Sequence, residues 1–284
     1  MALMQFANPK SRIGKDAVEA ELKFIDPAGG VPVTYTYEPP AGTPQRSGTY
    51  VSQRVFGRTT SLDREAFIVR QHQSRVTDFS DESVIRQVYY PEVAELVKTQ
   101  TGASSVLVFD HTVRTTAPGG PERNELNEPV MVMHNDYTSQ SAPRRVRELL
   151  SPEQAAQMLQ HRVVEFNVWR PIRGPLQTKP LAVCDAASMK PSDFLRGERR
   201  YPVRVGEFFA IAYNARQRWH YFPDMLPSEA LLIKCYDSDK SRAQFCAHGA
   251  FDDPTTPTNA LPRESIETRA FAFFSPSVLP LPKQ

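Results

Sequence analysis

The chain has 284 residues, of which 40% are hydrophobic and 10% aromatic, and its formal net charge is +2. This composition excludes a disordered chain, and the balanced charge argues against a nucleic-acid-binding protein, which needs a concentrated basic patch. The densest basic cluster, residues 196–200, is interpreted as a solvated loop. β-rich chains of this length often form one domain, so we expect a single domain spanning residues 1–284.

Cysteine usage and hydropathy bear on the compartment. Three cysteines occur without a Cys-x-x-Cys pair, which argues against a disulfide framework or a structural zinc site. No segment resembles a signal peptide, and no run approaches the ~18 apolar residues of a membrane span. The sequence therefore predicts a cytoplasmic protein that contacts neither membrane nor nucleic acid, and it does not indicate an oligomeric state.

The first hundred residues predict little regular structure before a helix. Residues 1–50 are expected to form an N-terminal arm, with a turn-rich connector at residues 39–44. Apolar residues recur at helical spacing over residues 81–100, and Pro91 fits the start of a new helix there. A second helix is predicted from Ser151, which can cap a helix that begins with proline.

Short strands at fairly even spacing dominate the rest of the chain. They are predicted at residues 105–109, 130–133, 162–169, 181–184, 208–213, 218–222, 230–236, 245–251 and 265–274. Neither a Gly-x-Gly-x-x-Gly fingerprint nor a P-loop occurs, and strands do not alternate with helices. The pattern favours a mainly β fold with flanking helices, an antiparallel sandwich or barrel over about residues 100–275.

A candidate metal site begins at His134, which follows the apolar run 130–133. In an extended strand, residues i and i+2 point to the same side, so His134 and Asp136 can face one metal. His248, on a later predicted strand, would complete two imidazoles and one carboxylate, a set suited to iron(II) with open coordination positions. The alternative is a strand-end histidine bonded to the backbone, because a His-x-Asp triplet also arises by chance. Glu165 near His161 is interpreted as a surface pair.

The last predicted strand carries charged residues at one parity. Arg263, Ser265, Glu267 and Arg269 share a face, and a buried guanidinium there would need an anion. A dicarboxylate cosubstrate would supply one through a bidentate pair, with the serine hydroxyl as a further donor. The alternative is an edge strand whose charged face is in water.

Several longer sequence blocks, within about residues 17–274, are similar to those of a known family. They are Tyr89–Val93, Val108–Arg114, His134–Thr138, Asn167–Pro175, Arg218–Pro223, Leu231–Cys235, His248–Phe251 and Pro262–Glu267. With them, the chain resembles the iron(II)/2-oxoglutarate-dependent oxygenases, specifically the fungal hydroxylase/desaturase family that is called gibberellin desaturase-like or cephem methoxylase-like.

The resemblance implies a double-stranded β-helix, the jelly-roll or cupin-like core, with iron at one mouth. It assigns the metal to His134, Asp136 and His248. It assigns the distal carboxylate of 2-oxoglutarate to Arg263 with Ser265, and places Arg269 second as a cosubstrate residue.

Other residues in the similar blocks are harder to assign. Asn167 either contacts the cosubstrate or a metal-bound water, or it is a structural amide. Tyr137, Trp169, Arg170 and Tyr221 are candidate substrate contacts, although Arg170 should point away from Asn167 and Trp169 if the strand is regular. Asp110 and Arg114 share a face and are expected to form an ion pair that braces the pocket.

The implied reaction couples oxidative decarboxylation of 2-oxoglutarate, which gives succinate and CO₂, to oxidation of an unactivated C–H bond by O₂. The substrate is expected to be a small molecule of fungal secondary metabolism, and hydroxylation, desaturation, cyclisation and demethylation all stay open. Two alternatives are an iron oxidase of the same fold that uses no 2-oxoglutarate, and a zinc-dependent or noncatalytic cupin-like protein.

Overall fold

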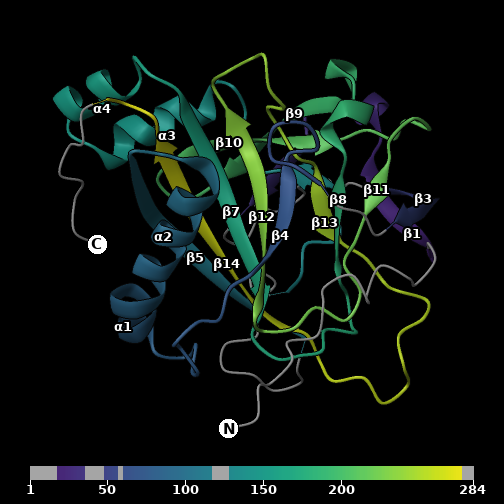
Figure 1. Ribbon diagram of the computed structural model, residues 1–284. Helices are drawn as coiled ribbons and strands as arrows, with labels where there is room; N and C mark the ends of the chain where they lie inside the picture. Colours follow the sequence, from purple (N-terminus) through teal and green to yellow (C-terminus); the bar gives the residue numbers. More distant parts are fainter. Residues whose placement is uncertain (1–17, 36–47, 57–59, 117–127, 277–284) are drawn as a thin grey trace, which may run out of the picture.

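Two β-sheets form the centre of the computed structural model of the protein, which describes residues 18–35, 48–56, 60–116 and 128–276 (Figure 1). The larger sheet has nine strands in the order β1-β3-β11-β8-β13-β6-β10-β9-β2. Its strands are β1 (Val18–Ile25), β2 (Val33–Tyr35), β3 (Gly48–Phe56), β6 (His134–Asn135), β8 (Leu181–Cys184), β9 (Phe194–Arg200), β10 (Val205–Ile211), β11 (Trp219–His220) and β13 (His248–Ala250).

The smaller sheet is antiparallel and has the order β4-β12-β7-β14-β5. Its strands are β4 (Phe67–Gln71), β5 (Ser105–Thr115), β7 (Val163–Pro171), β12 (Glu229–Asp237) and β14 (Glu264–Phe273). Neighbouring residues of a strand face opposite sides, so each strand of this sheet contributes side chains to both faces of the sheet. The β7 residues Val164, Phe166 and Val168 belong to an apolar cluster on the outer side, whereas Trp169 packs with an inner one.

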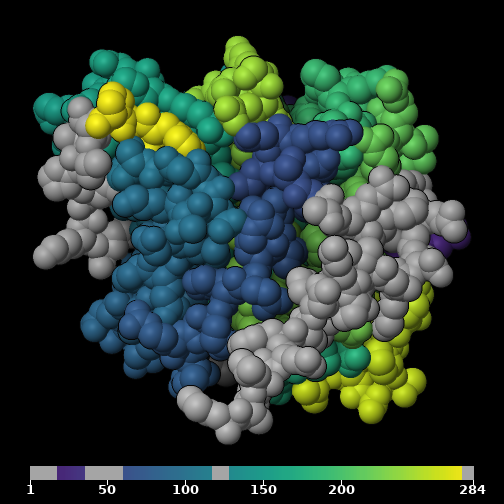
Figure 2. Space-filling model, viewed as in Figure 1, coloured from purple at the N-terminus to yellow at the C-terminus, as the bar shows by residue number. Residues whose placement is uncertain are grey.

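Helices lie on both faces of the smaller sheet. The outer face is covered by α1 (Glu82–Val84), a π-helical turn (Ile85–Tyr89) and α2 (Tyr90–Thr101). The helices α3 (Ser141–Leu149) and α4 (Pro152–Met158) pack against residues of the opposite face, Phe271 and Phe273 among them. Short 3₁₀ turns lie at Pro27–Gly29, Ala186–Ser188 and Pro191–Asp193. Figure 2 shows the segments that contain β4, α1 and α2 lying together over one face of the molecule.

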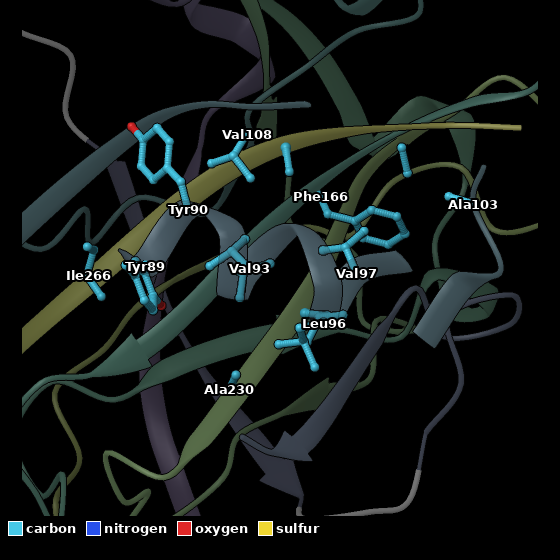
Figure 3. Close-up of a cluster of buried hydrophobic side chains, with 14 of the residues drawn as sticks. Tyr89, Tyr90, Val93, Leu96, Val97, Ala103, Val108, Phe166, Ala230 and Ile266 are labelled. Carbon is cyan, nitrogen blue, oxygen red and sulfur yellow. The ribbon is translucent and has the colours of Figure 1, made fainter. Parts of the chain in front are cut away.

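Helix α2 is held by its apolar side. Val93 and Val97 are fully buried, and Figure 3 shows Val97 beside Phe166 of the sheet and Ile266 beside Tyr89. Burial of each valine stabilises the fold by roughly 1.5–3 kcal/mol. The helix ends at Gly102, whose φ of 72° is a left-handed conformation that glycine adopts without strain.

The structure confirms the mainly β jelly-roll fold and corrects some details. Of the arm expected at residues 1–50, residues 18–25 and 33–35 are strands of the larger sheet and β3 begins at Gly48, while the connector at 39–44 lies outside the described residues. Residues 196–200 lie in β9 and not in a loop. Within 130–133 only Val132 forms a β-bridge, and the strand β6 starts at His134, so the triplet opens a strand instead of closing one. None of the described helices is long and apolar enough to cross a membrane.

Candidate metal centre

Three potential ligands meet on the inner side of the larger sheet. Strands β6 and β13 are neighbours, and their register places His248 opposite His134, with imidazole centroids 4.6 Å apart. Asp136 follows β6, and its Oδ1 lies 3.6 Å from His134 Nε2. One donor atom from each of the three residues lies within 4.8 Å of the others. The predicted triad is therefore brought together with the spacing of a metal site.

Backbone carbonyls orient both imidazoles. His134 Nδ1 donates to Val132 O at 2.7 Å, and His248 Nδ1 donates to Cys246 O at 3.0 Å. This leaves each Nε2 as the free acceptor, which is how second-shell partners fix a ligating tautomer. His248 Nε2 is buried and has no hydrogen-bond partner among the described residues. Burial, followed by the neighbouring His248, lowers the pKa of His134 to about 4, so this ligand is neutral at physiological pH.

The two oxygens of the Asp136 carboxylate have different partners. Oδ1 points to the histidine side, whereas Oδ2 accepts hydrogen bonds from Asn167 Nδ2 at 2.8 Å and Arg269 Nε at 3.2 Å. Burial alone would favour the protonated form, but the charges of Arg269 and His134 hold the pKa of Asp136 well below its usual range. Asp136 is thus an anion ready to bind a cation.

The two candidate cosubstrate arginines have different surroundings. Arg269 lies among carboxylates: besides Asp136, it contacts Glu267 at 2.5 Å and Asp110 at 3.4 Å. Asp110 pairs with Arg269. The prediction of an ion pair between Asp110 and Arg114 is therefore wrong, and Arg114 Nη1 donates to Glu128 O. A β-bulge between β5 and β14 brings Arg269 opposite Asp110.

Arg263 is buried, and it forms no ion pair with any of the described residues. Its guanidinium donates to Lys179 O at 2.7 Å and to Ser265 Oγ at 3.1 Å, and it lies 5.1 Å from the centre of the Trp169 ring. Within the described part of the chain, no carboxylate lies within 4.0 Å of it. Burial, together with Arg114, lowers the pKa of Arg263 to about 9. Such a guanidinium is stabilised by any anion that reaches it.

Strand β7 places the arginine and the metal ligands side by side. Trp169 contacts Arg263, and Asn167, two residues earlier on the same face, contacts Asp136. Two residues of a strand span about 7 Å, so the guanidinium and the triad are separated by roughly the length of a short molecule. The indole Nε1 of Trp169 and the amide Oδ1 of Asn167 are buried with no partner among the described residues.

The structure separates the other candidate substrate contacts. Tyr137 lies beside the inner clusters, with its ring 6.0 Å from that of Phe271. Arg170 points to the opposite face from Trp169, where it bonds His72 and stacks on Tyr89. The structure therefore places Arg170 outside the candidate site.

Tyr221 also lies outside the inner clusters. Its ring is 5.5 Å from that of Phe251 and belongs to an apolar cluster with Trp219 and Phe24. His220, the preceding residue, faces the inner ring of Phe67 instead. Tyr221 is thus a core residue of the larger sheet's other face.

Sequence reasoning missed Glu165, which is fully buried and not a surface partner of His161. It shares the inner face of β7 with Asn167, and alternation along the strand was the signal that could have found it. Neither of its carboxyl oxygens has a hydrogen-bond partner among the described residues. Burial, and then the charge of Asp136, raises the pKa of Glu165 well above its usual range, which favours the neutral carboxyl in the folded protein.

A Glu165→Gln variant is expected to gain stability relative to wild type as pH rises. The unfolded chain releases the Glu165 proton near pH 4.5, whereas the folded chain keeps it, so wild type loses stability above that pH until the raised folded pKa is reached. Glutamine does not titrate, so we expect the free energy of unfolding of the variant to exceed that of wild type by more at pH 8 than at pH 5. Urea unfolding of both metal-free proteins at the two pH values measures it; a difference independent of pH would contradict the neutral carboxyl.

Comparison with known proteins places this geometry in a family. A family model described as "Oxidoreductase/YMDC permease-like domain" matches residues 22–273. The chain is 35% identical over 236 residues to hydroxylase/desaturase CTB9 of Cercospora beticola, covering 75% of this chain and 72% of that protein. It is 29% identical over 274 residues to the Fe(II)/2-oxoglutarate-dependent dioxygenase nvfI of Aspergillus novofumigatus, covering 90% and 96%.

Solved structures agree with these relatives. The iron and alpha-ketoglutarate-dependent endoperoxidase NvfI superposes with a TM-score of 0.81 at 26% identity, covering 92% of this chain and all of that one. The fold, the His-Asp-His group and the relatives lead to one assignment. The chain belongs to the family of fungal iron(II)/2-oxoglutarate-dependent dioxygenases and hydroxylase/desaturases.

Proposed function

We propose that this protein oxidises an unactivated C–H bond of a small molecule of secondary metabolism, with iron(II), 2-oxoglutarate and O₂. The observation that carries the proposal is the pairing of a two-histidine, one-carboxylate group with a buried arginine that has no carboxylate partner among the described residues. The first fits iron(II) with open coordination positions, and the second fits the far end of a dicarboxylate.

The residues divide the work in the following way. His134, Asp136 and His248 hold the metal through the two free Nε2 atoms and Oδ1. Arg263, supported by Ser265, binds the distal carboxylate of 2-oxoglutarate. Bound iron supplies the redox chemistry that couples O₂ to decarboxylation of the cosubstrate and oxidation of the C–H bond.

The chain itself contributes orientation and exclusion of water. Carbonyl partners keep both imidazoles in one tautomer, and the buried walls around Asn167 and Trp169 keep bulk water from the cosubstrate. Tyr137 is the side chain we propose for the substrate side. Cys184, Cys235 and Cys246 are free and buried, which is consistent with a reducing cytosol as the working compartment.

The experiment is an anaerobic titration of the purified protein with iron(II) and then 2-oxoglutarate. We expect a visible metal-to-ligand charge-transfer band that appears only when both are present, and not with zinc or with succinate as controls. Oxygenation with candidate metabolites should then release succinate with product.

The rival functions predict other results. An iron oxidase that uses no 2-oxoglutarate would bind iron but give neither the band nor succinate. A zinc-dependent cupin would give product without iron or O₂.

A further inference from the structure

We infer that Arg269 is a positioning residue for the metal ligand Asp136, and that the pair of Arg269 and Asn167 holds this carboxylate so that a single oxygen faces the metal. The inference rests on the proposed function and deepens it, because it separates two arginines that lie six residues apart on one strand segment. Arg263 then binds the cosubstrate, and Arg269 does not.

The contacts to Asp136 come from two directions. Asn167 on β7 and Arg269 on β14 are directly paired in the register of the sheet, and both donate to Oδ2. The other oxygen, Oδ1, lies toward His134. Two hydrogen bonds on Oδ2, one of them charge-assisted, oppose rotation of the carboxylate about its Cβ–Cγ bond.

The guanidinium of Arg269 is fully engaged elsewhere. Its Nη2 contacts Glu267 at 2.5 Å, and its Nη1 lies 3.2 Å from Thr112 Oγ1 and 3.4 Å from Asp110 Oδ2. Three carboxylates thus surround one positive charge. A dicarboxylate cosubstrate gains little from this arginine, because it would have to displace Glu267 or Asp136.

The hydrogen bonds to Oδ2 of Asp136 have a chemical consequence for metal binding. A carboxylate free to rotate can bind iron through both oxygens, which would occupy a coordination position that the cosubstrate or O₂ needs. A carboxylate whose second oxygen is already bonded binds through one. Glu267, by fixing Arg269, is the outer support of this arrangement.

The test compares Arg269→Gln with Arg263→Gln. We expect Arg269→Gln to weaken iron(II) affinity by about 10–100-fold in the absence of 2-oxoglutarate, because loss of an outer partner of a metal ligand has this effect. We expect the affinity of the iron-loaded variant for 2-oxoglutarate to change by less than about 3-fold. Arg263→Gln should show the reverse: unchanged iron affinity and weak 2-oxoglutarate binding.

A spectroscopic readout follows the ligand geometry without turnover. Cobalt(II) bound in place of iron should show a changed visible absorption in Arg269→Gln, because its intensity reports coordination number and symmetry. Arg269→Lys, which keeps the charge but lacks the fork that reaches Asp136 and Glu267 together, should give an intermediate metal affinity. Asn167→Ala removes the other bond to Oδ2 and should weaken metal binding in the same direction, which keeps the test available if Arg269→Gln does not fold.

The outcomes separate the inference from the function on which it rests. If Arg269→Gln binds iron as tightly as wild type and loses 2-oxoglutarate, Arg269 is a cosubstrate residue and the inference is wrong. It is also wrong if both Arg269→Gln and Asn167→Ala leave the iron affinity and the cobalt spectrum unchanged. If the wild-type protein binds no iron, the proposed function itself fails.

Discussion

The His134→Ala variant is expected to lose at least about 100-fold in iron(II) affinity and to form no product above background. Removal of outer partners of metal ligands already weakens binding by 10–100-fold, so loss of a ligand should exceed this. The remaining pair, His248 and Asp136, offers only two donor atoms. Anaerobic titration with iron(II), followed by product analysis, measures both effects.

A surface histidine supplies the control. His161 lies outside the metal group and is partly exposed, so His161→Ala should bind iron and turn over substrate like wild type. Because the pKa of His134 is lowered to about 4, protons should not compete for this ligand between pH 8 and 6. Intact iron binding in His134→Ala would remove the metal assignment.

The Arg263→Gln variant is expected to raise the KM for 2-oxoglutarate by at least about 30-fold, which corresponds to ~2 kcal/mol, the lower range for truncation of a buried charge pair. Arg263→Lys should recover part of the loss, since it keeps the charge but not the bidentate geometry. Steady-state kinetics with varied 2-oxoglutarate, and the charge-transfer band under anaerobic conditions, measure the effect.

The same substitution should have an opposite effect on the protein without ligands. An unneutralised buried guanidinium destabilises the fold, so metal-free Arg263→Gln is expected to be at least as stable as wild type. Iron and 2-oxoglutarate together should then raise the Tm of wild type and have a smaller effect on the variant. A variant that is strongly destabilised without ligands and keeps its 2-oxoglutarate affinity would show that Arg263 is structural.

The sequence predicted the parts of the fold that depend on local alternation. The predicted strand at 181–184 coincides with β8, and those at 230–236 and 265–274 differ from β12 and β14 by one residue at each end. Helix α3 was missed because its apolar side is short, with only Ala142 and Val146 as buried apolar residues. The N-terminal strand β1 does alternate, since Ala20, Leu22 and Phe24 are buried between polar residues, and this signal was overlooked.

The candidate site, too, could be predicted only in part from the sequence. His134 and Asp136 could be paired from spacing alone, since i and i+2 share a face in any strand. The role of Arg269 could not be predicted, because it depends on which residue of β7 lies opposite, and that register is set by the whole sheet. Arg170 and Tyr221 were proposed because they stand in blocks similar to the family, and the packing places both of them in other clusters.

The alternation of β14 also limits how this protein can change by insertion or deletion. Its inward residues carry the charged groups of the site, while Ile266, Ala270 and Ala272 fill the cluster under α2. One residue added or removed between Arg263 and Arg269 would exchange the two faces, moving charge into the apolar cluster and methyl groups into the site. Substitutions can alter metal and cosubstrate binding separately, but a change in length here would remove both together, so homologous chains should keep the six-residue spacing of these arginines constant.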